Sequence, residues 1–154
     1  MSTNESRIDA SRETVWDVLS DPKMYPSWVV GAKETRYADG SWPEPGSEFG
    51  HTQGIWPLRV RDTTAAVEAE PPRRLLMEAR VRPFVVSRVE FVLEPEGIGT
   101  RVTMREWTVG GLGGFVSEFL TDPLLKARNV EALRRLRRGC EAREAKLSAA
   151  GRST

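Results

Sequence analysis

A series of short strand-like segments followed by one long amphipathic stretch constrains this sequence more than any other feature. Turn signals at Asp39-Gly40, Glu70-Pro71-Pro72 and Pro95–Gly99 divide the chain between positions 32 and 109. The segments that we expect to form strands are 32–38, 46–55, 58–69, 73–82, 84–94 and 100–109, with one more ending at Ile8. Their spacing of about ten residues predicts an antiparallel meander.

Apolar and charged residues alternate within these segments. In 84–94, Val89 and Phe91 fall on one face, whereas Arg88 and Glu90 fall on the other. Successive side chains of a strand point to opposite faces, so the predicted sheet has one apolar face and one charged face. The apolar face requires a second layer to cover it.

The C-terminal third supplies this cover. Apolar residues recur near the helical period from Phe115 to Cys140. The pattern predicts a helix from Asp122 to about Leu147, which at 1.5 Å per residue is roughly 39 Å long and can cross the sheet. We expect the tail, 148–154, to be frayed.

Two short helices are expected near the N-terminus. Ser11 is a suitable cap for a helix that ends at Leu19. Asp21 and Pro22 match the cap and first position of a second helix, which would run toward Trp28.

Composition excludes several classes of function. The 154 residues fit one domain, 1–154, with an ordered core expected over about 3–147. The 23 Lys and Arg against 22 Asp and Glu leave a net charge of +1, so we expect no nucleic-acid partner. The sequence shows neither a long apolar run nor a secretory-type leader. We therefore expect a cytoplasmic protein without membrane insertion.

Metal and disulfide chemistry are limited by two residues that occur once each. Cys140 is the single cysteine and His51 the single histidine. One chain can therefore form neither a disulfide framework nor the two-histidine iron and zinc motifs. We expect no metal and no cofactor.

Three stretches together resemble one known family. They are Ile8–Trp28, Gly99–Met104 with Glu106, and a closing helix that carries Arg128-Asn129. The sequence is similar to the polyketide cyclase/dehydrase group of START-like (SRPBCC, Bet v 1-like, helix-grip) proteins over roughly residues 3–145. The resemblance implies an α+β helix-grip fold. In that fold a seven-stranded curved antiparallel sheet wraps around a long C-terminal helix, and two short helices follow the first strand.

The layout predicts an apolar cavity between the sheet and the long helix. We expect it to bind a hydrophobic or aromatic small molecule, lipid-like or polyketide-like. The expected ligand contacts are Trp28, Phe49, His51, Gln53, Met77, Ala79, Val89, Phe91, Met104, Glu106, Phe115 and Phe119. His51, Gln53 and Glu106 share the inward phase of their segments and would orient polar groups. Phe115 and Phe119 would form a lid over the mouth.

Two other functions compete with ligand binding, because the superfamily fold does not settle activity. In the first, a polyketide cyclase or dehydratase, His51 and Glu106 act as the catalytic acid–base pair. Against it stands a structural role, in which Glu106 bonds a neighbouring backbone group or arginine and His51 lies partly exposed at the rim. The second is a protein-interaction module of the co-chaperone kind, with an exposed apolar patch around Trp107 or Trp42. An exposed Trp107 would also fit a homodimer contact.

Overall fold

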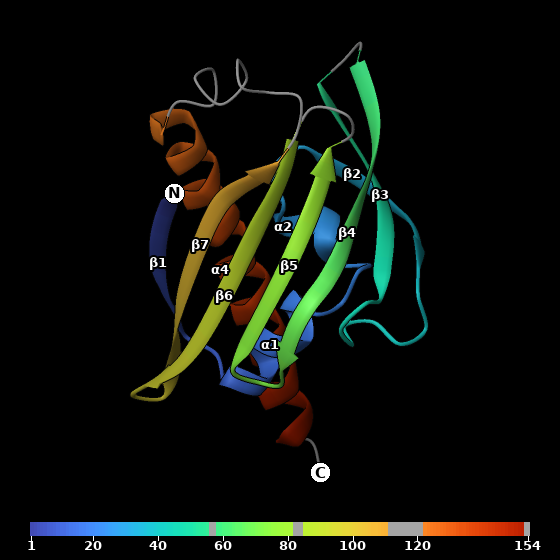
Figure 1. Cartoon of the computed structure of the whole chain (residues 1–154). Helices are drawn as coiled ribbons and strands as arrows, with labels where there is room; N and C mark the ends of the chain where they lie inside the picture. The colour runs from blue at the N-terminus through green and yellow to red at the C-terminus, as the bar shows by residue number, and fades with distance from the viewer. Residues whose placement is uncertain (56–57, 82–84, 111–121, 153–154) are drawn as a thin grey trace.

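The chain forms one curved antiparallel sheet wrapped around a long helix, as shown in the computed structural model (Figure 1). The structure describes residues 1–55, 58–81, 85–110 and 122–152. The strands are β1 (Ser2–Ile8), β2 (Ala32–Ala38), β3 (Glu48–Ile55), β4 (Leu58–Glu70), β5 (Arg74–Val81), β6 (Val85–Glu96) and β7 (Gly99–Gly110). Their spatial order, β1-β7-β6-β5-β4-β3-β2, is a meander with β1 added beside β7. The predicted fold class is thus confirmed.

Within the described residues, three helices pack on the sheet. They are α1 (Arg12–Leu19), α2 (Tyr25–Trp28) and α4 (Asp122–Gly151). In Figure 1, α4 runs behind the sheet, with α1 at the lower end. The α4 helix contacts β1, α2 and α1. The buried residues of α4 include Leu133, Leu136 and Cys140, which lie on one stripe at helical spacing.

The first helix begins as the sequence predicts. The Ser11 hydroxyl accepts a hydrogen bond from the Thr14 backbone N–H at 3.2 Å, which satisfies one of the free donors of the first turn. The second helix does not begin at Pro22, as expected, but at Tyr25. Asp21 instead closes a turn, because its carboxylate accepts from the backbone N–H of Lys23 at 2.9 Å.

Two other boundaries differ from the expected ones. Residues 39–47 form a longer connection between β2 and β3 than the tight turn predicted at Asp39-Gly40. The Asp39 carboxylate accepts from the Glu48 backbone N–H at 2.9 Å, so this residue closes the start of β3. The long helix continues to Gly151 and includes part of the expected frayed tail, since Ala149 and Ala150 favour helix.

Gly99 allows the end of β1 to lie close to the start of β7. A Cβ at Gly99 would lie 2.5 Å from the carbonyl oxygen of Ile8. The register places Ile8 opposite Thr100, so the two backbones meet here at the end of the β1–β7 ladder. Only glycine permits so close an approach.

Candidate functional site

The interior between the sheet and α4 is closed at one end and open at the other. Along β5, Leu75 is fully buried and Met77 is 3% exposed, whereas Ala79 is partly exposed. On β6, Phe91 is fully buried, whereas Ser87 is partly exposed. The register places Ala79 opposite Ser87, so exposure increases in the same direction on both strands.

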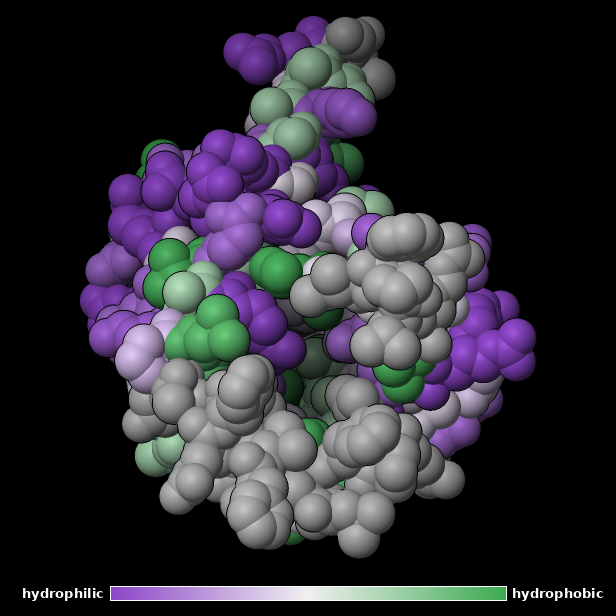
Figure 2. All heavy atoms as spheres, turned by 90° about the horizontal axis from the view of Figure 1, so that it is seen from above, coloured by the Kyte–Doolittle hydropathy of each residue, from purple (hydrophilic) through white to green (hydrophobic). Residues whose placement is uncertain are grey.

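The helix that covers this interior shows the same gradient. Leu136 is 1% exposed and Leu133 is 3% exposed. Leu125, which lies nearer the start of α4, is partly exposed. Figure 2, which looks down on the upper end of Figure 1, shows a hollow with apolar side chains in its depth. This open end is the candidate binding site.

An aromatic group forms the inner part of the site. The Tyr25 ring lies 5.1 Å from that of Trp28, 4.8 Å from Phe49 and 4.8 Å from His51, centroid to centroid. Burial raises the pKa of Tyr25 to about 12, so its hydroxyl stays protonated at neutral pH. The α2 helix therefore places an uncharged aromatic surface against β3.

Trp42 adds to this aromatic group. Its ring lies 4.6 Å from Phe49, and its Nε1–H donates to the Ser20 carbonyl at 2.8 Å. Trp42 is therefore partly buried and does not form the exposed patch considered for it, because the 39–47 connection folds its side chain back onto the core.

His51 is fully buried and lies on the inner face of β3. The expectation that it lies partly exposed at a rim is wrong, because Tyr25 and Phe49 pack against its ring. Burial, followed by the nearby Arg36 charge, lowers its pKa to about 4. The imidazole is therefore neutral at neutral pH.

Gln53 lies beside His51 on the same face of β3. The Gln53 amide nitrogen is 3.0 Å from His51 Nε2. An amide nitrogen can only donate, so Nε2 accepts and the single proton of the neutral imidazole is on Nδ1. Nδ1 has no hydrogen-bond partner among the described residues.

Asp62 is the functional candidate that sequence reasoning missed. It is 1% exposed on β4, directly opposite His51 in the β3–β4 register. Neither carboxyl oxygen has a hydrogen-bond partner among residues 1–55, 58–81, 85–110 and 122–152. Burial raises its pKa to about 6, although the Arg36 charge opposes the shift. The sequence contained one signal for Asp62. This residue, Thr64 and Ala66 occupy alternate positions along one predicted strand, so the three share its inner face.

Glu106 has a different partner from the one expected for an acid–base pair. Nη2 of Arg128 donates to both Glu106 carboxylate oxygens, at 2.7 Å each. The Glu106 side chain is 5% exposed and that of Arg128 is 39% exposed. This is the structural alternative that the sequence left open. His51 is thus adjacent to Asp62, while an arginine of α4 neutralises Glu106.

The remaining predicted contacts divide between core and mouth. Gln53 and Ala79 are partly exposed at the open end. Trp28, Phe49, Met77, Val89, Phe91 and Met104 belong to the buried apolar cluster. Phe115 and Phe119, the predicted lid, lie outside the described residues.

Unpartnered polar atoms concentrate in this part of the molecule. Besides those of His51 and Asp62, they include Trp28 Nε1 and both amide atoms of Asn129 on α4. A further one, Nε of Arg12, lies at the start of α1. Buried polar groups of folded proteins nearly always bond to protein, water or ligand. The arrangement therefore fits an interior that receives polar groups from outside the chain.

Among the residues that the structure describes, no group of three or more His, Cys, Asp or Glu side chains could hold a metal ion. None of the described helices is both long enough and apolar enough to cross a membrane.

Comparison with known proteins identifies the family. The family described as "Polyketide cyclase / dehydrase and lipid transport" matches residues 2–141, so the chain belongs to this family. The resemblance inferred from the sequence is confirmed. No curated protein matches the chain significantly.

Solved structures share the fold at low sequence identity. Protein CV1439 from Chromobacterium violaceum is 13% identical with a TM-score of 0.71, over 90% of this chain and 95% of that one. Protein NE0264 from Nitrosomonas europaea is 18% identical with a TM-score of 0.70, over 92% and 94%. A Rhodobacter sphaeroides protein is 20% identical with a TM-score of 0.69, over 96% and 91%. These similarities show the fold alone.

Proposed function

We propose that this protein binds a hydrophobic or aromatic small molecule, lipid-like or polyketide-like, between the sheet and α4. The observation that carries the proposal is that Nδ1 of His51 and both Asp62 carboxyl oxygens are buried without a hydrogen-bond partner among the described residues. They belong to an interior that opens at one end (Figure 2). Leaving such groups without partners costs free energy. A bound molecule, with or without water, would supply the missing hydrogen bonds, and the apolar walls would bury its rings or chains.

We also propose that the protein is cytoplasmic.

The charge pattern supports a small-molecule partner rather than a nucleic acid. On the exposed face of α4, Arg134 and Arg135 both pair with Glu131, and Arg137 pairs with Glu141. The basic run therefore forms an ion-paired surface, in keeping with the net charge of +1.

A cyclase or dehydratase is the second candidate, favoured by the family's description. It would use the same interior, with His51 as one proton-transfer group. Glu106 could take part only after the contact with Arg128 is broken. A His51→Ala variant with undiminished turnover would rule out this mechanism.

The protein-interaction candidate has less support. It requires an exposed apolar patch at Trp42 or Trp107, yet both residues are partly buried, and Trp42 packs against Phe49. A homodimer formed through Trp107 stays a prediction of the sequence.

Native mass spectrometry of protein freshly purified from its own host tests the binding function. We expect an extra mass that is lost on denaturation and corresponds to an apolar organic compound. Ala79→Trp, which fills the open end, should remove this mass, whereas Arg80→Trp, on the outer face of the same strand, should keep it. Protein mass alone, together with no binding of apolar aromatic probes, would overturn the proposal.

A further inference from the structure

The chemistry of His51 and Asp62 restricts what the interior can recognise. Gln53 donates to Nε2 of His51, which leaves Nδ1–H as a buried donor without a partner in the described part of the chain. Burial keeps the ring neutral by lowering its pKa to about 4. This wall of the site thus offers one hydrogen-bond donor from β3.

Asp62 offers the complementary acceptor next to it. His51 and Asp62 are direct partners in the β3–β4 register, and both are buried on the inner face. Directly opposed residues of antiparallel strands have Cβ atoms about 5 Å apart. Nevertheless, Nδ1 of His51 and both Asp62 oxygens lack a hydrogen-bond partner among the described residues. A buried donor and a buried acceptor therefore lie on neighbouring strands, each with an unused hydrogen bond among the described residues.

Few functional groups satisfy both at once. A ketone accepts a hydrogen bond but leaves Asp62 without a donor, and an ammonium group donates but leaves Nδ1–H unused. A carboxylate would be repelled by Asp62. A hydroxyl can accept from Nδ1–H and donate to the carboxylate through the same oxygen.

The surrounding side chains favour a flat ring as the carrier of this hydroxyl. Tyr25 and Phe49 both pack against the His51 ring, at 4.8 and 5.6 Å between centroids. Aromatic rings associate through such edge and offset contacts. We propose that His51 and Asp62 bind the hydroxyl of a hydroxylated aromatic ligand, with Asp62 as the residue that selects hydroxyl over carbonyl or ether groups. This inference rests on the ligand-binding function proposed above.

Three naphthalene probes with the same ring test the proposal on the full chain. They are 2-naphthol, which donates and accepts, 2-methoxynaphthalene, which only accepts, and naphthalene, which does neither. Dissociation constants would be measured at neutral pH by isothermal titration calorimetry. Because hydrogen bonds to charged groups are strong, we expect 2-naphthol to bind at least about tenfold more tightly than the other two.

Variants of Asp62 show whether this residue is the source of the preference. Asp62→Leu should abolish the preference for 2-naphthol while still binding naphthalene. Asp62→Asn keeps the shape and one acceptor oxygen but loses the charge, so it should reduce the preference without abolishing it. This milder variant also serves if the leucine variant fails to fold.

The outcomes separate the two proposals. Equal binding of all three probes by the wild type, or an unchanged preference in the Asp62 variants, would overturn the hydroxyl assignment and leave the binding function standing. Failure of all three probes to bind the wild type would overturn the binding function itself, and the hydroxyl assignment with it.

Discussion

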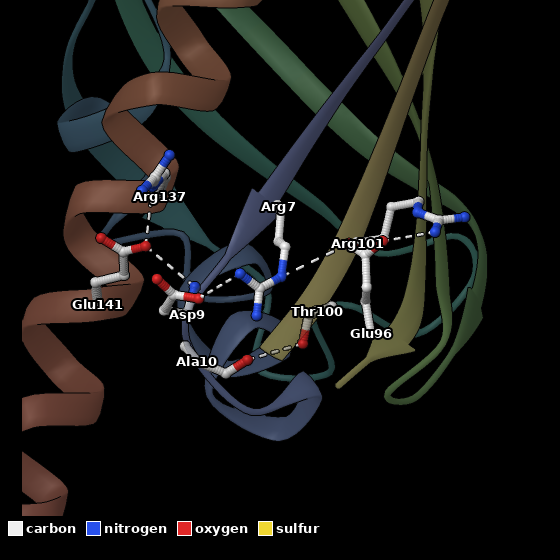
Figure 3. Close-up of polar contacts among 8 residues, drawn as sticks. All are labelled: Arg7, Asp9, Ala10, Glu96, Thr100, Arg101, Arg137 and Glu141. Carbon is white, nitrogen blue, oxygen red and sulfur yellow. Dashed lines mark hydrogen bonds and ion pairs between the residues drawn. The ribbon is translucent and has the colours of Figure 1, made fainter. Parts of the chain in front are cut away.

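The two ends of the molecule differ in how most of their polar groups are paired. At the closed end, several polar side chains, most of them exposed, have partners within the protein (Figure 3), although Nε of Arg12 is buried without one among the described residues. Glu141 of α4 accepts from the Asp9 backbone N–H at 3.0 Å and from Nε of Arg137 at 2.9 Å. The Thr100 hydroxyl donates to the Ala10 carbonyl at 2.9 Å. These contacts join the long helix to the β1–α1 connection, and that connection to the start of β7.

At the open end the groups that most need partners lack them. His51 and Asp62 are 0% and 1% exposed. Nδ1 of His51 and both carboxyl oxygens of Asp62 are unpaired among the described residues. A sequence under selection for stability alone would place apolar residues here. The contrast is the one expected if the closed end holds the fold together and the open end has the binding function proposed above.

The largest effect is expected from a core truncation at the closed end. Phe91→Ala should lower the free energy of unfolding by about 3 to 5 kcal/mol, because the ring is fully buried and packs against Trp28. Val85→Ala, on the same strand at the partly exposed mouth, should cost less than about 1 kcal/mol. Urea denaturation measures both. Equal losses would mean that both ends are packed alike.

The Arg128–Glu106 pair should be the most costly contact to break in the site. Arg128→Met should destabilise the fold by about 3 kcal/mol, because it leaves the Glu106 carboxylate buried without its cation. Arg135→Met, which removes an exposed partner of Glu131 on the same helix, should change stability by less than about 0.5 kcal/mol. A similar small change in both variants would contradict the structural role of Glu106.

Removing Asp62 should stabilise the protein. At pH 7, Asp62→Leu should raise the free energy of unfolding by about 1 to 3 kcal/mol, because it eliminates a buried carboxylate that has no hydrogen-bond partner among the described residues. The exposed control Asp17→Leu, which only removes an ion pair with Arg143, should change it little. Destabilisation by Asp62→Leu would mean that Asp62 has a structural partner.

The gain from Asp62→Leu should depend on pH. The Asp62 pKa rises from 3.8 to about 6 on folding, so the stabilising protonated form is fully present below pH 3.8 and is lost as pH rises through 6. The variant's advantage should therefore shrink toward pH 4. The His51 pKa falls from 6.5 to about 4, so its contribution is lost as pH falls from 6.5 to 4 in both proteins. Denaturation at pH 4 and pH 7 measures the difference, and a gain independent of pH would contradict the assignment.

The smallest effect is expected at the paired, exposed end. Glu141→Gln should lower the free energy of unfolding by less than about 1 kcal/mol, since surface ion pairs are weak and screened. The loss should be smaller still in 1 M salt. A larger loss, or one unaffected by salt, would show that this contact does more than fasten the helix to the start of α1.

Local patterns predicted the framework of this fold. The alternation of Val89 and Phe91 with Arg88 and Glu90 identified a two-faced strand, and the structure buries Val89 and Phe91 on its inner face. The Ser11 cap was also predictable, because its partner lies three residues away. The stripe of α4 follows from helical period alone. Such features depend on neighbours in sequence.

The site depends on pairings that sequence patterns do not contain. His51 and Asp62 become neighbours only through the β3–β4 register, and a slip of one residue would place Asp62 on the opposite face. Glu106 meets Arg128 across 22 positions, from a strand to a helix. The expected acid–base pair of His51 and Glu106 rested only on the alternation of side chains, which placed both residues on the inner face. Alternation tells which face of the sheet a residue occupies, but not which residue it contacts.

A crystal structure of the protein with 2-naphthol tests most directly whether the open end is a binding site. We expect electron density for the ring between β3, β4 and α4, with its oxygen about 3 Å or less from both Nδ1 of His51 and a carboxyl oxygen of Asp62. Side chains that fill this space completely, with 2-naphthol bound only on the outer surface, would contradict both the ligand-binding function and the role given to these two residues.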